Sequence, residues 1–304
     1  MTTSEMRLSS AEAIPLAYAL VARVAADHGI RALAIKGVVL AHHGLREPRV
    51  SADIDVMVHP DDLDAMQAAM ESADWRLAGP HENPQILGHH SIDLLNDHWP
   101  IGLDLHSFFP GFLAPASEVF EILWQRRIEL PQAGHPVQFT DLASSAAIAA
   151  LHHLRSLWRP ENETAFDRLV EKASTRLDAS DRADLSRLSE ETGCVRPLAP
   201  FFDRIGMTVA PSHPAEDTEY ERWMLGTTAH PYTAWWYAFK ELPWRERPRY
   251  IWYALVLSPD EIRAYHGDHA SETPLWKLRV QRVTRVCRAV PSVMKREIER
   301  RRKV

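Results

Sequence analysis

The sequence predicts an α+β protein in which a small mixed sheet flanked by helices is followed by a mainly helical C-terminal region. Strand-like and helix-like segments alternate over the first part of the chain, up to residue 109. The short stretch "NDHWP" between two strand segments indicates a hairpin, which a purely parallel sheet would not contain. Beyond residue 140, apolar residues recur with the helical period of 3.6.

The first half begins with a predicted helix over residues 9–28, because Ser9 and Glu12 match a capping box and Gly29 matches a helix stop. A strand over 31–35 runs directly into a helix over 36–44. Further strands are predicted over 53–58, 75–79, 87–95 and 101–109, and a further helix over 60–73 with Pro60 at its first position.

In the second half, residues 140–158 are predicted to form a helix capped by Thr140 or Asp141, and residues 161–174, 180–193 and 219–229 continue the helical pattern. The length of 304 residues suits two domains. We therefore expect one domain over 1–140 and a helical domain over 141–304.

The composition is that of an ordinary globular protein, with 45% hydrophobic and 25% charged residues. Two distant cysteines exclude a disulfide scaffold, and the N-terminus lacks a signal-peptide pattern, so we expect a cytoplasmic protein. No apolar run reaches the length of a transmembrane segment. Residues 277–304 contain eleven Lys and Arg against two Glu. This basic tail could bind RNA, or it could be a solvated helix face.

The stretch "SADIDVMVHP" places Asp53 and Asp55 on the same face of a strand, because side chains alternate along a strand. A third carboxylate, Asp104, shares a strand face with His106 in "IGLDLHSFF". If the two strands pair, three carboxylates converge, and their mutual repulsion calls for a cation with oxygen ligands. One or two Mg²⁺ ions fit best, with Mn²⁺ as an alternative.

Lys36 and Gly37 lie where the strand over 31–35 turns into the following helix. A glycine at such a turn lets a phosphate group approach the backbone, and the helix N-terminus adds positive potential. Lys36 could supply a charge to a triphosphate, and Arg49, four residues before Asp53, could do the same.

In this order, a KG turn, an arginine, a DxD strand and a later strand aspartate resemble the polymerase-β-type nucleotidyltransferase superfamily. Residues 31–109 are similar in particular to its uncharacterised bacterial nucleotidyltransferase family, whose members carry an "LKG" turn, an "R…DIDLLV" strand and a "V(D/E)LHW" strand. The superfamily usually has Gly-Ser at the turn, whereas Val38 follows Gly37 here, a feature that the narrower family shares.

The resemblance implies transfer of a nucleotide monophosphate from an NTP to an acceptor, with release of pyrophosphate. It implies that Asp53 and Asp55 hold both metals and that Asp104 holds the catalytic metal and acts as a base. It also implies that the triphosphate contacts a set of residues before and at the DxD strand, namely Lys36, Gly37, Arg49 and Ser51.

Other polar residues allow more than one interpretation. His89 could line an acceptor site or lie on the surface, and His106 could contact the acceptor or support a metal ligand. His153 and Asp167 could face the acceptor or form hydrogen bonds between helices. The paired histidines do not favour a zinc site, because neighbours in a strand or helix point apart. The Trp- and Tyr-rich segment 231–253 could stack on bases or form an aromatic core.

The preferred hypothesis is a nucleotidyltransferase that acts on a hydroxyl or other nucleophile of a small molecule or peptide. A toxin-like enzyme that modifies RNA or protein is one alternative, and the basic tail favours it. A non-catalytic nucleotide-binding protein of the same fold is the other. The sequence identifies neither the acceptor nor the base of the NTP.

Overall fold

The fold is described from a computed structural model of the chain, which covers residues 8–78, 90–157, 160–210, 217–228, 239, 242–248, 274–281 and 284. Contacts divide the chain into two units, one of residues 1–79 with 89–228 and one of residues 80–88 with 229–304. The sheet, the helices α1 to α9 and the site all lie in the first unit.

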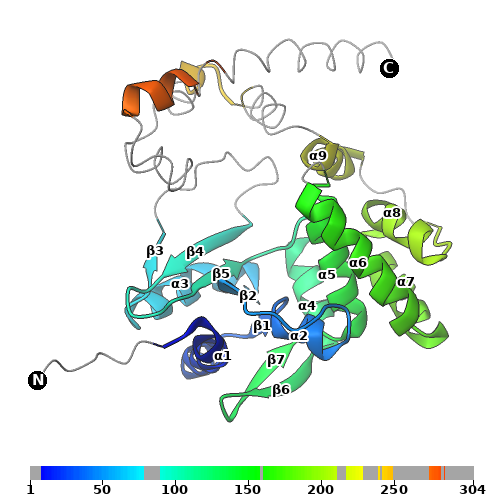
Figure 1. Cartoon of the computed structure of the whole chain (residues 1–304), viewed down its shortest axis with the longest axis horizontal. Coiled ribbons are helices and arrows are strands. Elements are labelled where there is room, and N and C mark those ends of the chain that lie inside the picture. The colour runs from blue at the N-terminus through cyan, green and yellow to red at the C-terminus, as the bar shows by residue number, and fades with distance from the viewer. Residues whose placement is uncertain are drawn as a thin grey trace, which may run out of the picture. The chain divides into compact units, whose positions relative to one another are not determined.

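A seven-stranded mixed sheet is the framework of this unit (Figure 1). Its order is β3-β4-β5-β2-β1-β7-β6. The strands are β1 Ala32–Ala34, β2 Asp53–Val58, β3 Arg76–Leu77, β4 Ser91–Leu95, β5 Gly102–His106, β6 Ile128–Gln132 and β7 His135–Phe139. The β2/β5 and β1/β7 pairs are parallel, and the other four pairs are antiparallel. The mixed sheet expected from the sequence is therefore confirmed.

Helix α1 precedes the first strand, α2 to α4 lie between strands along the chain, and α5 to α9 come after the last strand. They are α1 Ser10–Asp27, α2 Val38–His42, the 3-10 helix η1 Pro60–Asp62, α3 Leu63–Glu71, α4 Ala116–Gln125, α5 Leu142–Leu154, α6 Pro160–Arg176, α7 Ala179–Glu191, α8 Val195–Ile205 and α9 Asp217–Thr228. None of the helices in the described part of the chain has the length and apolar character needed to cross a membrane.

The predicted helix ends agree closely with the structure. The Ser9–Glu12 capping box is present in full, and Gly29 follows the helix with a positive φ of 70°. Asp141, rather than Thr140, caps α5, because its carboxylate accepts the N–H of Ser144 at 2.9 Å. At Pro60 the chain first forms the 3-10 turn η1, so the regular helix begins three residues later than predicted.

Four elements were not predicted from the sequence: α4, α8 and the β6/β7 hairpin. The hairpin strands carry Pro131 and Pro136, which weaken a strand pattern, and β6 occupies the edge of the sheet, where a missing N–H costs least. The strand predicted over 75–79 is reduced to the two residues of β3. Residues 87–89 of the strand predicted over 87–95 lie outside the described residues.

Two apolar clusters hold the unit together. One cluster joins α1 and α3 to one face of the sheet, the face that carries Ile54, Val56 and Leu105. The other joins α4 to α8 with residues such as Leu33 and Phe109. Since Ile54 and Val56 point into the first cluster, strand alternation directs Asp53 and Asp55 to the opposite face. Beyond Phe139, the elements of the first unit are all helices.

Candidate active site

Carboxylates from three strands form a row across the sheet. Asp55 of β2 is in register with Asp104 of the parallel strand β5. Asp93 of β4 is in register with Asp104 from the other side. Directly paired residues point to the same face with their Cβ atoms about 5 Å apart. The strand pairing on which the convergence of Asp55 and Asp104 depended is thus confirmed, whereas Asp93 was not predicted as a member of the row.

The group most suited to a metal ion is Asp55, Asp104 and His106. One ligand atom from each of these side chains lies within 4.8 Å of the other two. Asp53 lies outside this group, and its Oδ1 atom accepts a hydrogen bond from the Ser51 hydroxyl at 3.0 Å. The two carboxylates suit Mg²⁺ or Mn²⁺, whereas an imidazole is a more usual ligand of softer ions such as Zn²⁺.

Lys36 and His106 both contact the same oxygen of Asp55. The Lys36 ammonium forms an ion pair with Oδ1 of Asp55, and both side chains are largely buried. Nε2 of His106 lies 3.2 Å from this oxygen. Burial by itself raises the pKa of Asp55, but Lys36 and the hydrogen bond from His106 outweigh it and hold the pKa well below the usual range. Asp55 is therefore ionised at all ordinary pH values.

Asp104 behaves in the opposite way. Burial and the neighbouring carboxylates of Asp55, Asp93 and Asp53 raise its pKa to about 8. Without a bound cation, Asp104 therefore carries a proton at neutral pH. A divalent cation between Asp55 and Asp104 would remove the repulsion that holds this proton in place. The electrostatics of the row thus suit the binding of a divalent cation.

His106 is a buried, neutral imidazole. Burial lowers its pKa, although Asp55 acts in the opposite direction. When Nε2 donates to Asp55, Nδ1 is left as an acceptor, and this atom is buried without a hydrogen-bond partner among the described residues.

The turn that presents Lys36 is held from two sides. Gly37 has a φ of 68°, and a Cβ atom at this position would lie only 2.3 Å from the Tyr18 hydroxyl oxygen. Tyr18 donates to the Lys36 carbonyl at 3.4 Å, and Arg46 donates to the Gly37 carbonyl at 2.8 Å. Glycine is required here for both its backbone conformation and its size.

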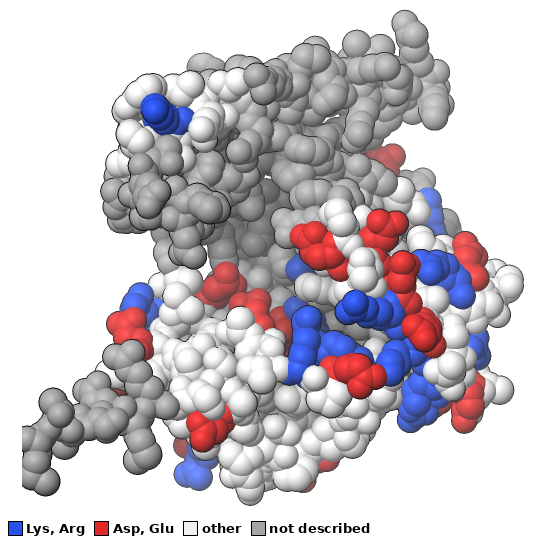
Figure 2. All heavy atoms as spheres, viewed as in Figure 1, with Lys and Arg blue, Asp and Glu red and all other residues white. Residues whose placement is uncertain are grey.

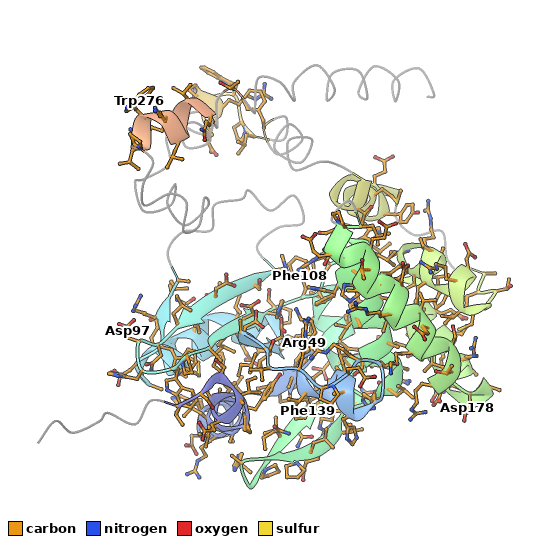
Figure 3. The ribbon with its side chains drawn as sticks, in the orientation of Figure 1. Arg49, Asp97, Phe108, Phe139, Asp178 and Trp276 are labelled. Carbon is orange, nitrogen blue, oxygen red and sulfur yellow. The ribbon has the colours of Figure 1, made fainter. Side chains whose placement is uncertain are left out.

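The C-terminal end of α5 brings further polar groups to Lys36. Burial and then the charges of Arg49, Lys36, Arg46 and Arg155 lower the pKa of His153 to about 4. Figure 3 shows Arg49 in the loop before β2, between the strands and the helices α5 and α6. In Figure 2, acidic and basic side chains lie next to each other in this central part of the face.

Four residues near the site were missed by sequence reasoning: Arg46, His90, His152 and Arg155. Nη1 of Arg155 lies 3.2 Å from Nε2 of His90, and the His90 ring lies 5.9 Å from the His106 ring. Burial and then Lys36 and Arg155 lower the pKa of His152 well below its usual value. These residues come from three separate segments, since His152 and Arg155 both lie at the end of α5, so no local spacing could have brought all of them together.

Some predicted residues lie elsewhere or cannot be placed. Asp167 of α6 accepts a hydrogen bond from Arg204 of α8 at 2.6 Å, and both side chains are about half exposed. This contact between helices matches the second interpretation given above for Asp167. His89 lies outside the described residues, as does most of segment 231–253 and most of the basic tail.

Comparison with known proteins was made at the levels of sequence and fold. The sequence model of a family described as "Uncharacterised nucleotidyltransferase" matches residues 10–203. Comparison with curated protein sequences gives no match.

Two solved structures are similar at low identity. The first is the solution structure of the antibiotic-resistance factor ANT(2'')-Ia, with a TM-score of 0.40 and 12% identity over 64% of this chain and 97% of that chain. The second is an antigenic nucleotidyltransferase-like protein from Paracoccidioides brasiliensis, with a TM-score of 0.38 and 13% identity over 67% of this chain and 96% of that chain.

Proposed function

This chain belongs to the uncharacterised nucleotidyltransferase family, and from that premise we propose that it transfers a nucleotide monophosphate from an NTP to an acceptor and releases pyrophosphate. The acceptor is a hydroxyl or another nucleophile of a small molecule or peptide. The observation that carries the proposal is the direct register of Asp55 with Asp104, next to the Lys36 ammonium.

Asp53, Asp55 and Asp104 are the proposed metal ligands, and Mg²⁺ is the proposed ion, with Mn²⁺ as a substitute. The ligand atoms of Asp55, Asp104 and His106 lie close together, and burial and the neighbouring carboxylates raise the pKa of Asp104. Both features support a cation at this position. When bound, the ion would neutralise charge on the reacting phosphate and orient it.

In the proposed reaction, the acceptor oxygen forms a bond to the α-phosphorus while the bond from that phosphorus to the bridging oxygen breaks. Pyrophosphate leaves with the electron pair of the broken bond. Asp104 accepts the proton of the acceptor hydroxyl, a role in which its carboxylate must be ionised, and its place in the row beside Asp55 suits this role. Lys36, Gly37, Arg49 and Ser51 are proposed to contact the nucleotide, and positive charge near its phosphates favours the transition state.

Residues 141–304, which the sequence pattern predicts to be mainly helical, are proposed as the acceptor side of the enzyme. The C-terminal turn of α5 supports this, because His152 and His153 lie within electrostatic reach of Lys36. His153 and His106 are proposed to contact the acceptor or to orient a metal ligand.

The test is titration calorimetry of each NTP, with and without Mg²⁺, against the wild type and Asp55→Asn. We expect binding that needs both the metal and Asp55. The matched control is Asp27→Asn, which removes one carboxylate from an exposed ion pair with Arg23 on α1. Failure of every NTP to bind to the folded wild type would contradict the proposal.

Catalysis is tested separately, by pyrophosphate release in the presence of pooled hydroxyl compounds and peptides. Mass spectrometry should detect an acceptor whose mass has increased by one nucleotide monophosphate. Wild type that binds NTP and metal but modifies no acceptor in any pool would favour the non-catalytic hypothesis instead.

A further inference from the structure

Beyond the residues that the family pattern supplies, two arginines lie at the same site. Arg46 follows α2, and Arg155 follows the last residue of α5. Neither belongs to the KG turn, to the DxD strand or to the Asp104 strand, and neither was predicted from the sequence.

Arg155 and Lys36 share Phe109 as a neighbour. Nζ of Lys36 lies 5.8 Å and the guanidinium carbon of Arg155 lies 5.9 Å from the centroid of the Phe109 ring. The contact between Arg155 and His90 continues through the His106 ring to Asp55. Arg155 is thereby connected to the carboxylate that the metal is proposed to share.

Arg46 flanks the turn on which Lys36 lies. One guanidinium nitrogen donates to the Gly37 carbonyl, whereas the Nε atom is buried without a hydrogen-bond partner among the described residues. Since a buried donor without a partner destabilises the fold, the Nε atom marks a place where a ligand oxygen could bind. Arg46 thus stabilises the turn through one guanidinium nitrogen and has its Nε donor available for a ligand.

The neighbouring imidazoles are consistent with an anion at this position. Nδ1 of His152 and Nδ1 of His153 are both buried without a partner in the described part of the chain. Lys36 and Arg155 act electrostatically on both rings. Four cations, Lys36, Arg46, Arg49 and Arg155, act on the His153 ring, and a polyanion would be attracted to the point around which they gather.

We propose that Arg46 and Arg155, together with Lys36, form the binding site for the β- and γ-phosphates of the nucleotide, and that they replace the hydroxyl group which Val38 does not provide at the turn. This inference rests on the proposed function and adds two residues to it. Guanidinium groups suit the task because each can donate two parallel hydrogen bonds to a phosphate.

The experiment compares Arg155→Gln and Arg46→Gln with the wild type by calorimetry against the NMP, NDP and NTP of the preferred base, all with Mg²⁺. We expect NTP binding to weaken by roughly 10- to 100-fold and NMP binding to change by less than about threefold. A purely structural defect would weaken all three ligands alike. Arg155→Lys should bind NTP more tightly than Arg155→Gln but more weakly than the wild type, because lysine keeps the positive charge but cannot donate two parallel hydrogen bonds.

Arg23→Gln is the matched control, since it removes one cation from an exposed pair on α1 and should leave NTP binding unchanged. Thermal unfolding verifies that each variant is folded. Arg155→Gln is the decisive variant should Arg46→Gln disturb the turn.

Inorganic tripolyphosphate, titrated into the same proteins, separates this inference from the proposed function. Tripolyphosphate binding that depends on Arg155, with no binding of any NTP, would support the phosphate site and contradict the nucleotidyltransferase. NTP binding that is equal in wild type, Arg155→Gln and Arg46→Gln would overturn the inference and leave the proposed function intact. Absence of both kinds of binding in folded wild type would overturn both.

Discussion

Asp55 and Asp104 lie directly opposite each other on the parallel strands β2 and β5, and their surroundings shift their pKa values in opposite directions. Both are affected by burial, which raises the pKa of a carboxyl group. Lys36 contacts Asp55 and outweighs burial there, whereas Asp104 faces other carboxylates. The pair therefore holds one negative charge and one proton until a cation binds.

The raised pKa of Asp104 makes stability depend on pH. An unfolded aspartate has a pKa of about 3.9, so the folded state holds a proton that the unfolded state loses between about pH 4 and pH 8. The free energy of unfolding should therefore fall as pH rises through this range. Asp104→Asn should remove this component and stabilise the metal-free protein at pH 8.5 by on the order of 5 kcal/mol. Urea denaturation of both proteins from pH 5 to 9 measures the difference, and identical pH profiles would contradict it.

Metal binding should release this proton. We expect Mn²⁺ to bind more tightly as pH rises toward 8 and then to level off, because below that pH the ion competes with a proton on Asp104. At pH 7, calorimetry in buffers of different ionisation enthalpy should show the release of nearly one proton per ion bound. A binding enthalpy that does not depend on the buffer would argue against Asp104 as a ligand.

Lys36→Met should leave the buried Asp55 carboxylate without its cation. Loss of one partner of a buried ion pair costs about 3–5 kcal/mol, so the unfolding free energy at pH 8.5 should fall by that order. Mn²⁺ should then stabilise Lys36→Met more than the wild type, because the ion supplies the missing positive charge.

Lys172→Met provides the comparison for Lys36→Met, since Lys172 forms an exposed ion pair with Glu47 and its loss should leave the free energy of unfolding nearly unchanged. The unfolding temperatures of the wild type, Lys36→Met and Lys172→Met are measured with and without Mn²⁺. If Mn²⁺ raised the unfolding temperature of Lys36→Met and of the wild type equally, Mn²⁺ would not replace the charge that Lys36 gives to Asp55.

Gly37→Ala should destabilise the protein by about 3 kcal/mol or more, since the new methyl group meets the Tyr18 hydroxyl and the backbone conformation is unfavourable. Gly206→Ala is the control, because Gly206 has a similar φ of 71° with nothing within 4 Å of the added atom. It should cost about 1–2 kcal/mol. In a Tyr18→Phe background, the cost of Gly37→Ala should decrease, as a double-mutant cycle in urea would show. No change in that background would mean that the hydroxyl is not the obstacle.

Asp167→Asn should leave NTP binding unchanged and alter the unfolding free energy by no more than about 1 kcal/mol, because its ion pair with Arg204 is half exposed. Calorimetry with NTP and Mg²⁺ verifies this. A loss of binding comparable with that of Asp55→Asn would place Asp167 in the site after all.

The sequence alone determined those features that depend on neighbouring residues. The capping box at Ser9, the alternation that directs Asp53 and Asp55 to one face, and the glycine turn after Lys36 are all consequences of local backbone geometry. The family pattern then related these local features to Asp104. The β6/β7 hairpin escaped prediction because prolines interrupt its strand pattern, and only pairing with β1 places it in the sheet.

Tertiary structure decided which side chains meet. Asp93 joins the carboxylate row through strand register, and Arg46, His90 and Arg155 reach the site from separate segments. The protonation states of the row also depend on tertiary structure, because burial and through-space charges determine the pKa of each carboxyl group. The sequence can therefore name candidate residues for the site of this protein, but only the packing of the helices against the sheet sets the charges around them.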